Sequence, residues 1–123
     1  MKNDKEKLKN DFKRRLYNFS LRLIELLDGL ANDNVSKRLG DQLLRSGTSI
    51  LANYIEGQTA SSKKDFTNYF HISLKSANES KVWLALLKDS KRVSRDKTEW
   101  FFKELDEISN ISGSSLLTLK GKK

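Results

Sequence analysis

The sequence predicts an all-α protein, an antiparallel four-helix bundle with up-down-up-down topology. In four successive segments, apolar residues return at steps of three and four, which is the period of an amphipathic helix. The 123 residues include no proline and only six glycines, fewer breaking residues than a fold of many short strands would need. The connections are a few residues long, so each helix must return beside its predecessor. The length suits one domain spanning residues 1–123, with a basic start at 1–15 and a basic tail at 120–123.

The first helix is expected over residues 4–30, where one stripe holds Leu8, Phe12, Leu16, Phe19, Leu23, Leu26 or Leu27, and Leu30. Asp33 and Asn34 interrupt the pattern, and Asn34 or Ser36 is the expected N-cap of the second helix. The second helix carries Val35, Leu39, Leu43, Ile50 and Tyr54. It is expected to end near Gly57, a residue suited to the position after a C-cap.

The third helix is expected to begin at Ser61 or Ser62 and to bury Phe66, Phe70, Leu74, Ala77 and Leu84. Asp96 and Glu99 have the spacing of a capping box, which predicts the start of the fourth helix. That helix carries Phe101, Leu105 and Ile108, and Leu116 indicates that it resumes after Gly113.

The net charge of +8 is concentrated at the two chain ends, because residues 1–15 carry a net +4 and residues 116–123 a net +3. In the predicted topology both ends lie beside the loop that follows the second helix. Lysine and arginine that neutralise phosphates release counterions, so this end is a candidate nucleic-acid-binding surface. Its candidate residues are Lys2, Lys5, Lys7, Lys9, Lys13, Arg14, Arg15, Lys63, Lys64, Lys120, Lys122 and Lys123.

The second helix has more apolar surface than one core-facing stripe requires. Leu44, Leu51 and Ile55 extend the apolar arc and are candidates for an oligomer interface. Unusually complete wrapping by neighbouring helices is the alternative. The opposite side of the helix is a polar strip of Arg45, Ser49, Asn53 and Glu56. The strip faces a core, an interface or solvent. Glu79 of the third helix is a candidate ion-pair partner of Arg45.

Three segments carry a resemblance to a known family: RSGTSILANYIEG at 45–57, SKKDF at 62–66 and ANESKVWL at 77–84. They resemble a bacterial four-helix-bundle family. That family includes the proteins encoded in 23S ribosomal RNA intervening sequences and the accessory variability determinants of diversity-generating retroelements. Tyr54 and Ser76 depart from its usual pattern, where a smaller aliphatic residue and a glutamate are common. The resemblance implies a ring-like homopentamer with a basic surface. That surface would suit nucleic acid or a nucleic-acid-handling partner such as a reverse transcriptase.

Little in the sequence points to an enzyme, a cofactor or a metal. His71 is the only histidine, there is no cysteine, and no glycine-rich phosphate-binding motif occurs. No segment is long and apolar enough to span a membrane, and the charged start predicts a cytoplasmic protein. We therefore expect a non-enzymatic, oligomeric basic binding module that uses no small-molecule substrate and contacts nucleic acid without sequence specificity. The alternative is a protein-protein adaptor or a structural homo-oligomer.

Overall fold

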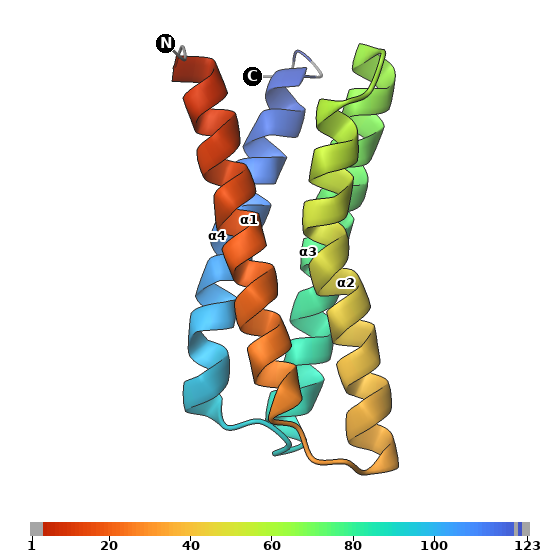
Figure 1. Ribbon diagram of the computed structural model, residues 1–123, viewed down its shortest axis with the longest axis vertical. Coiled ribbons are helices and arrows are strands. Elements are labelled where there is room, and N and C mark those ends of the chain that lie inside the picture. Colours follow the sequence, from red (N-terminus) through yellow and green to blue (C-terminus); the bar gives the residue numbers. More distant parts are fainter. Residues whose placement is uncertain (1–3, 120, 122–123) are drawn as a thin grey trace.

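The computed structural model of the protein describes residues 4–119 and 121. Four helices follow one another: α1 (Asp4–Asp28), α2 (Asn34–Gln58), α3 (Lys63–Asp89) and α4 (Arg95–Leu119). They run in alternating directions, so the connections α1–α2 and α3–α4 share one end of the bundle and the connection α2–α3 lies at the other (Figure 1). The described part of the chain contains no strand, and the all-α four-helix prediction is confirmed.

Two of the expected helix starts are wrong in detail. Asp33 caps α2, because its carboxylate accepts a hydrogen bond of 3.0 Å from the backbone N–H of Ser36. Ser94 is at the start of α4, where its hydroxyl accepts from the N–H of Lys97 at 3.3 Å and its carbonyl from the N–H of Thr98 at 3.2 Å. Ser62 caps α3 as one of the two expected residues, by accepting from the N–H of Asp65.

Gly57 does not follow the C-cap of α2, as the sequence predicted, since α2 continues to Gln58 and its C-cap is Thr59. A β-carbon at Gly57 would lie 3.2 Å from the β-carbon of Tyr69 on α3. The glycine therefore permits two helices to approach each other closely, and its role is packing rather than termination.

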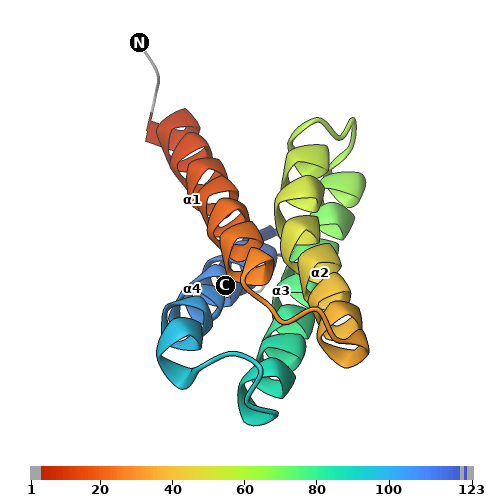
Figure 2. The same ribbon diagram turned by 60° about the horizontal axis from the view of Figure 1, so that its bottom comes forward.

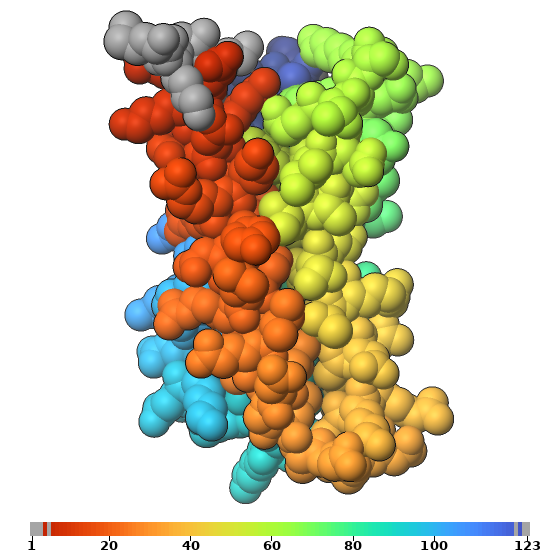
Figure 3. All heavy atoms as spheres, viewed as in Figure 1, coloured from red at the N-terminus to blue at the C-terminus, as the bar shows by residue number. Residues whose placement is uncertain are grey.

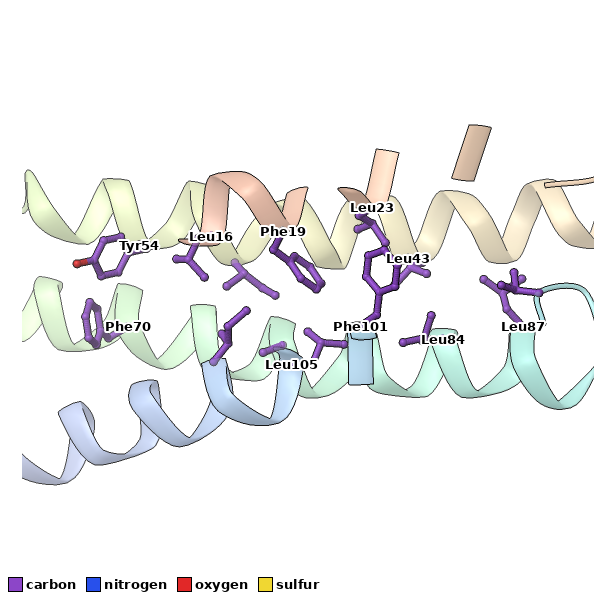
Figure 4. Packing of buried hydrophobic residues seen from close by; sticks show 14 of the residues in the cluster. Leu16, Phe19, Leu23, Leu43, Tyr54, Phe70, Leu84, Leu87, Phe101 and Leu105 are labelled. Atoms are coloured by element: carbon purple, nitrogen blue, oxygen red, sulfur yellow. The ribbon is translucent and has the colours of Figure 1, made fainter. Parts of the chain in front are cut away.

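The core fills the space between all four helices (Figure 4). Its fully buried residues include Leu16, Phe19 and Leu23 of α1, Leu43 and Ile50 of α2, Leu84 and Leu87 of α3, and Leu105 and Ile108 of α4. These positions match the apolar stripes of the sequence. Within the described chain, no helix combines the length and apolar character that crossing a membrane would need.

Helices α2 and α3 are the most closely packed pair, and small polar side chains fill their contact. The hydroxyls of Ser46 and Ser80 are 2.8 Å apart, and the hydroxyl of Ser76 donates to that of Ser49 at 3.0 Å. The hydroxyl of Ser73 donates to the carbonyl of Ile50 at 2.9 Å. Buried hydroxyls normally find such partners, and small side chains allow the two backbones to lie close together.

Helices α1 and α4 make the least contact of the neighbouring pairs, and α1 leans away from the rest of the bundle toward its N-terminal end (Figure 2). Polar and cation–π contacts connect them. Arg15 forms a two-pronged ion pair with Glu104, with nitrogen–oxygen distances of 2.7 and 2.9 Å. Two helical turns further along α1, the guanidinium of Arg22 lies 4.0 Å from the ring centre of Trp100.

Candidate nucleic-acid interface and association face

The first turns of α1, the connection between α2 and α3, and the last turns of α4 lie at the same end of the bundle (Figure 1). We call this the basic end. Four of the candidate cations, Lys2, Lys120, Lys122 and Lys123, lie outside the described residues. Lys5 belongs to α1, but its side chain also lies outside the described part.

Six other candidate cations of the basic end are exposed: Lys7, Lys9, Lys13, Arg14, Lys63 and Lys64. None of them forms an ion pair within the described part of the chain. Exposed, uncompensated lysine and arginine side chains can reach a phosphate without breaking an existing contact. The first turns of α1 and α3 also hold the carboxylates of Asp4, Glu6 and Asp65, so the charge available to a polyanion is the excess of the cations over these groups.

Arg15 differs from the other candidates because its charge is already compensated. Its guanidinium contacts both Glu104 and Glu107 of α4. The hydrogen bonds to Glu104 are the main reason that the pKa of Arg15 is raised. Arg15 therefore joins two helices of the bundle, and its guanidinium is not free in the way that the neighbouring Arg14 is.

At the opposite end of the bundle, some cations are paired with nearby carboxylates. The ammonium of Lys88 lies 3.7 Å from Asp89, and the guanidinium of Arg92 lies 3.8 Å from Asp33. Arg92 also donates to the hydroxyl of Ser36 at 3.1 Å, so it connects the two loops at this end. Lys37, Arg38, Lys91, Arg95 and Lys97 at this end are nevertheless exposed and form no ion pair in the described part of the chain. The basic end is distinguished by the net charge of its sequence segments, +4 over residues 1–15 and +3 over residues 116–123.

The candidate interface residues of α2 are not fully covered by the rest of the chain. Leu44 is 38% exposed, Ile55 is 41% exposed and Leu51 is partly buried. On the neighbouring helix, Tyr17, Leu21 and Ile24 are also exposed and lie on one side of α1, because they are four and seven residues apart. Their apolar character was not predicted from the sequence as part of an interface.

Tyr17 lies beside the α2 residues: together with Leu51 and Ile55 it lines a surface hollow of about 470 Å³ between α1 and α2. We call the surface formed by Tyr17, Leu21, Ile24, Leu44, Leu51 and Ile55 the α1–α2 apolar face. The two helices lie side by side across the front of Figure 3. This surface belongs to the type that marks an interaction site on a soluble protein.

The polar strip is divided between the α2–α3 contact and solvent. Ser49 is partly buried and accepts from Ser76, and the side-chain amide of Asn53 donates to the hydroxyl of Ser49 at 2.8 Å. Arg45 and Glu56 are exposed. The suggested pairing of Arg45 with Glu79 is present at 3.8 Å. The same Glu79 carboxylate accepts from the indole N–H of Trp83 at 2.9 Å, which holds it on the surface of α3.

His71 lies exposed on α3, without a hydrogen bond or ion pair in the described part of the chain. Among the described residues, no group of three or more histidine, aspartate or glutamate side chains is arranged to hold a metal ion.

The chain is similar in sequence to a known protein family and to a solved structure. Residues 9–114 match the model of the family described as 23S rRNA-intervening sequence protein. A solved structure from Bacteroides thetaiotaomicron, described as a protein of unknown function from the S23 ribosomal protein family, is 35% identical in sequence. The similarity covers 88% of this chain and 96% of that chain, with a TM-score of 0.82. None of the curated proteins compared with the chain matches it.

Proposed function

The chain belongs to the 23S rRNA-intervening sequence protein family, and we propose that it is an oligomeric binding protein whose basic end contacts nucleic acid through phosphate charge. The observation that carries this proposal is the set of six exposed cations at the basic end, none of which is ion-paired in the described part of the chain. No known base-reading element is evident in the sequence. The contact is therefore indifferent to sequence.

The salt dependence of binding tests this proposal directly. For four phosphate contacts, the affinity for duplex DNA or structured RNA falls on the order of a hundredfold between about 50 and about 200 mM salt, because each released counterion gains less entropy when the bulk salt concentration is higher. Fluorescence anisotropy of a labelled oligonucleotide measures the affinity at each salt concentration. Absence of detectable binding at about 50 mM salt would overturn the proposal.

A pair of double variants locates the contact. Lys63→Gln with Lys64→Gln removes two exposed charges from the first turn of α3 at the basic end. Arg95→Gln with Lys97→Gln removes two exposed charges from the first turn of α4 at the opposite end. We expect the first pair to reduce the slope of log affinity against log salt by about two, and the second to leave it nearly unchanged. Equal effects of the two pairs would show that binding does not depend on the basic end.

The α1–α2 apolar face supports a second part of the proposal, that copies of the chain associate through this face. Burying it against another copy removes apolar surface from water, which is the main driving force of association. The number of copies that the family resemblance implies is five. Light scattering at micromolar concentration tests association, and a stable monomer of 14.2 kDa would contradict it.

Substitutions with matched exposure separate this face from others. Ile55→Ser places a hydroxyl in the α1–α2 apolar face, whereas Leu117→Ser changes an exposed leucine of α4 outside it. We expect the first variant to shift the population toward monomer and the second to leave the mass unchanged. Association without any binding of nucleic acid would favour the alternative function, a protein-protein adaptor or structural oligomer.

A further inference from the structure

A groove lies at the basic end, where α1 and α4 diverge. Its volume is about 830 Å³, which lies in the range of pockets that hold drug-sized ligands. All four helices contribute to it. Its apolar lining consists mainly of Leu8, Phe12, Tyr54, Phe66, Phe70 and Leu119.

Four of these residues form a continuous series of aromatic rings. The ring centres of Phe12 and Tyr54 are 5.0 Å apart, those of Tyr54 and Phe70 are 5.3 Å apart, and those of Phe70 and Phe66 are 4.8 Å apart. Tyr54 and Phe70 face each other from α2 and α3 (Figure 4). Phe12 and Phe66 both line the groove and are only partly buried, so each keeps some exposed surface.

The rim of the groove is polar on the α2 and α4 sides. Gln58 contributes a side-chain amide, and Ser114, Ser115 and Thr118 contribute hydroxyls from α4. Asp11 adds a carboxylate from α1. The amide of Gln58 can both donate and accept hydrogen bonds, whereas the carboxylate of Asp11 only accepts. The hydroxyls of Ser115 and Thr118 donate to the carbonyls of Ile111 and Ser114, so their oxygens remain as acceptors. The rim therefore suits a ligand that is flat and apolar on its faces and polar at its edges.

Positive charge lies beside the groove. Lys9 is exposed and belongs to the lining itself. Lys63 is three residues before Phe66 and seven before Phe70, so it lies on the same side of α3 as these two lining rings. Neither lysine is ion-paired in the described part of the chain, so both can meet an anionic group at the mouth of the groove.

We infer that this groove receives an unpaired base of a single-stranded nucleic acid, with the base stacked on Phe12 and Phe66 and the adjoining phosphates on Lys9 and Lys63. Proteins recognise unpaired bases by combining aromatic stacking with a positively charged path for the backbone. A base in a duplex is already stacked and cannot enter. The inference rests on the proposed contact between the basic end and nucleic acid, and it adds a preference for single strands.

A comparison of base-bearing and abasic strands tests the inference. The probes are a labelled single-stranded oligonucleotide, the same strand with abasic positions, and the duplex of the same sequence, all at one salt concentration. We expect removal of the bases to weaken binding between about 5-fold and about 150-fold for each base that stacks, because the phosphates are retained while stacking is lost. A strand containing 2-aminopurine should change in fluorescence on binding, since the base leaves the stack of its strand neighbours and enters the groove.

A variant that fills the groove supplies the second test. Ser115 lines the groove, and within the described part of the chain its hydroxyl is bonded only to the carbonyl of Ile111 one turn earlier, so Ser115→Trp places a ring in the cavity. Leu117→Trp places the same ring at the same end of α4 but outside the groove lining. We expect the first variant to bind single strands as weakly as abasic strands, and the second to bind as the unchanged protein does. Circular dichroism checks that both variants remain helical.

The possible results separate the two proposals. If base-bearing and abasic strands bind equally and with the same salt dependence, the groove does not take bases, while phosphate contact by the basic end remains supported. If neither strand binds at about 50 mM salt, both proposals are wrong. If Ser115→Trp binds single strands as the unchanged protein does and 2-aminopurine keeps its fluorescence, the groove serves another ligand and the inference is overturned.

Discussion

At Gly47 of α2, the absence of a side chain allows α1 to cross α2 closely. A β-carbon there would collide with Cδ2 of Leu23, and would also lie 3.7 Å from Cε2 of Phe19. Leu23 and Phe19 are buried core residues, so neither can move aside freely. Gly113 of α4 is the contrasting case, because a β-carbon added there would have no neighbour within 4 Å.

We predict opposite effects of the same substitution at these two positions. Gly47→Ala should lower the free energy of unfolding by about 1–3 kcal/mol, the usual cost of overpacking a core. Gly113→Ala should raise it by about 0.5–1 kcal/mol, because alanine loses less backbone entropy than glycine in a helix. Urea unfolding followed by circular dichroism measures both. A stable Gly47→Ala protein would show that α1 and α2 can separate at this point without cost.

Asp33 makes stability depend on pH. Hydrogen bonds from the backbone and hydroxyl of Ser36 lower the pKa of its carboxyl below the ordinary value, and Arg92 lowers it further. Because the folded pKa lies below that of the unfolded chain, the ionised carboxylate stabilises the fold at neutral pH. This contribution is lost as the pH falls through the lowered pKa.

Asp33→Asn removes the titrating group while keeping an oxygen that can cap α2. We expect the variant to be less stable than the unchanged protein at about pH 7, and the difference to shrink at about pH 3, below the ordinary pKa of aspartate. Urea midpoints at the two pH values measure this. A difference that stays constant with pH would show that the charge of Asp33 contributes nothing to the stability of the fold.

Polar contacts join α1 to α4 alongside the aromatic contacts of Phe19 with Trp100 and Phe101. Glu104 is 14% exposed in its side chain and forms both prongs of the ion pair with Arg15, whereas the side chain of Glu107 is 62% exposed. Glu104→Gln should lower the free energy of unfolding by about 1–2 kcal/mol, since Arg15 is itself one-third exposed and water partly replaces the lost pair.

Glu107→Gln is the matched control for this prediction, because it makes the same substitution one turn away at a more exposed site. We expect its effect to stay within about 0.5 kcal/mol. Thermal unfolding of the three proteins at one concentration compares them. Equal effects of the two substitutions would mean that Glu104 holds α4 to α1 no better than a surface charge does.

The four helices could be predicted from the sequence because their apolar periodicity is strong over more than twenty residues each. Their starts were harder to predict. Asp33, Asn34 and Ser36 are all good capping residues within four positions. Asp33 is the N-cap because its backbone is extended and α2 begins at the next residue. Gly57 shows the same limit, because a glycine near a helix end is compatible both with termination and with close packing against Tyr69.

At the scale of the whole molecule, the alternating topology was enough to bring the basic segments to one end. The compensation of Arg15 was not foreseeable, because its partners are about ninety residues away in the chain. The aromatic groove was missed for a different reason. Phe12 and Phe66 lie on regular core stripes, and nothing in the periodicity indicates that α1 and α4 diverge there and leave these two side chains partly uncovered.

We predict that the proposed association and the proposed nucleic-acid binding are coupled. Each subunit contributes one basic end, so an oligomer presents several to the same polyanion, and binding by the second end becomes intramolecular once the first is engaged.

A variant that remains folded but monomeric, expected for Ile55→Ser, therefore retains every candidate cation and still loses affinity. The loss expected from multivalent contact is about 100-fold or more for a long strand, and much smaller for an oligonucleotide that spans only one basic end. Leu117→Ser should bind both strands as the unchanged protein does. Anisotropy with a short and a long strand measures the two affinities, and a monomeric Ile55→Ser protein that binds the long strand with undiminished affinity would show that a single basic end is the complete binding unit.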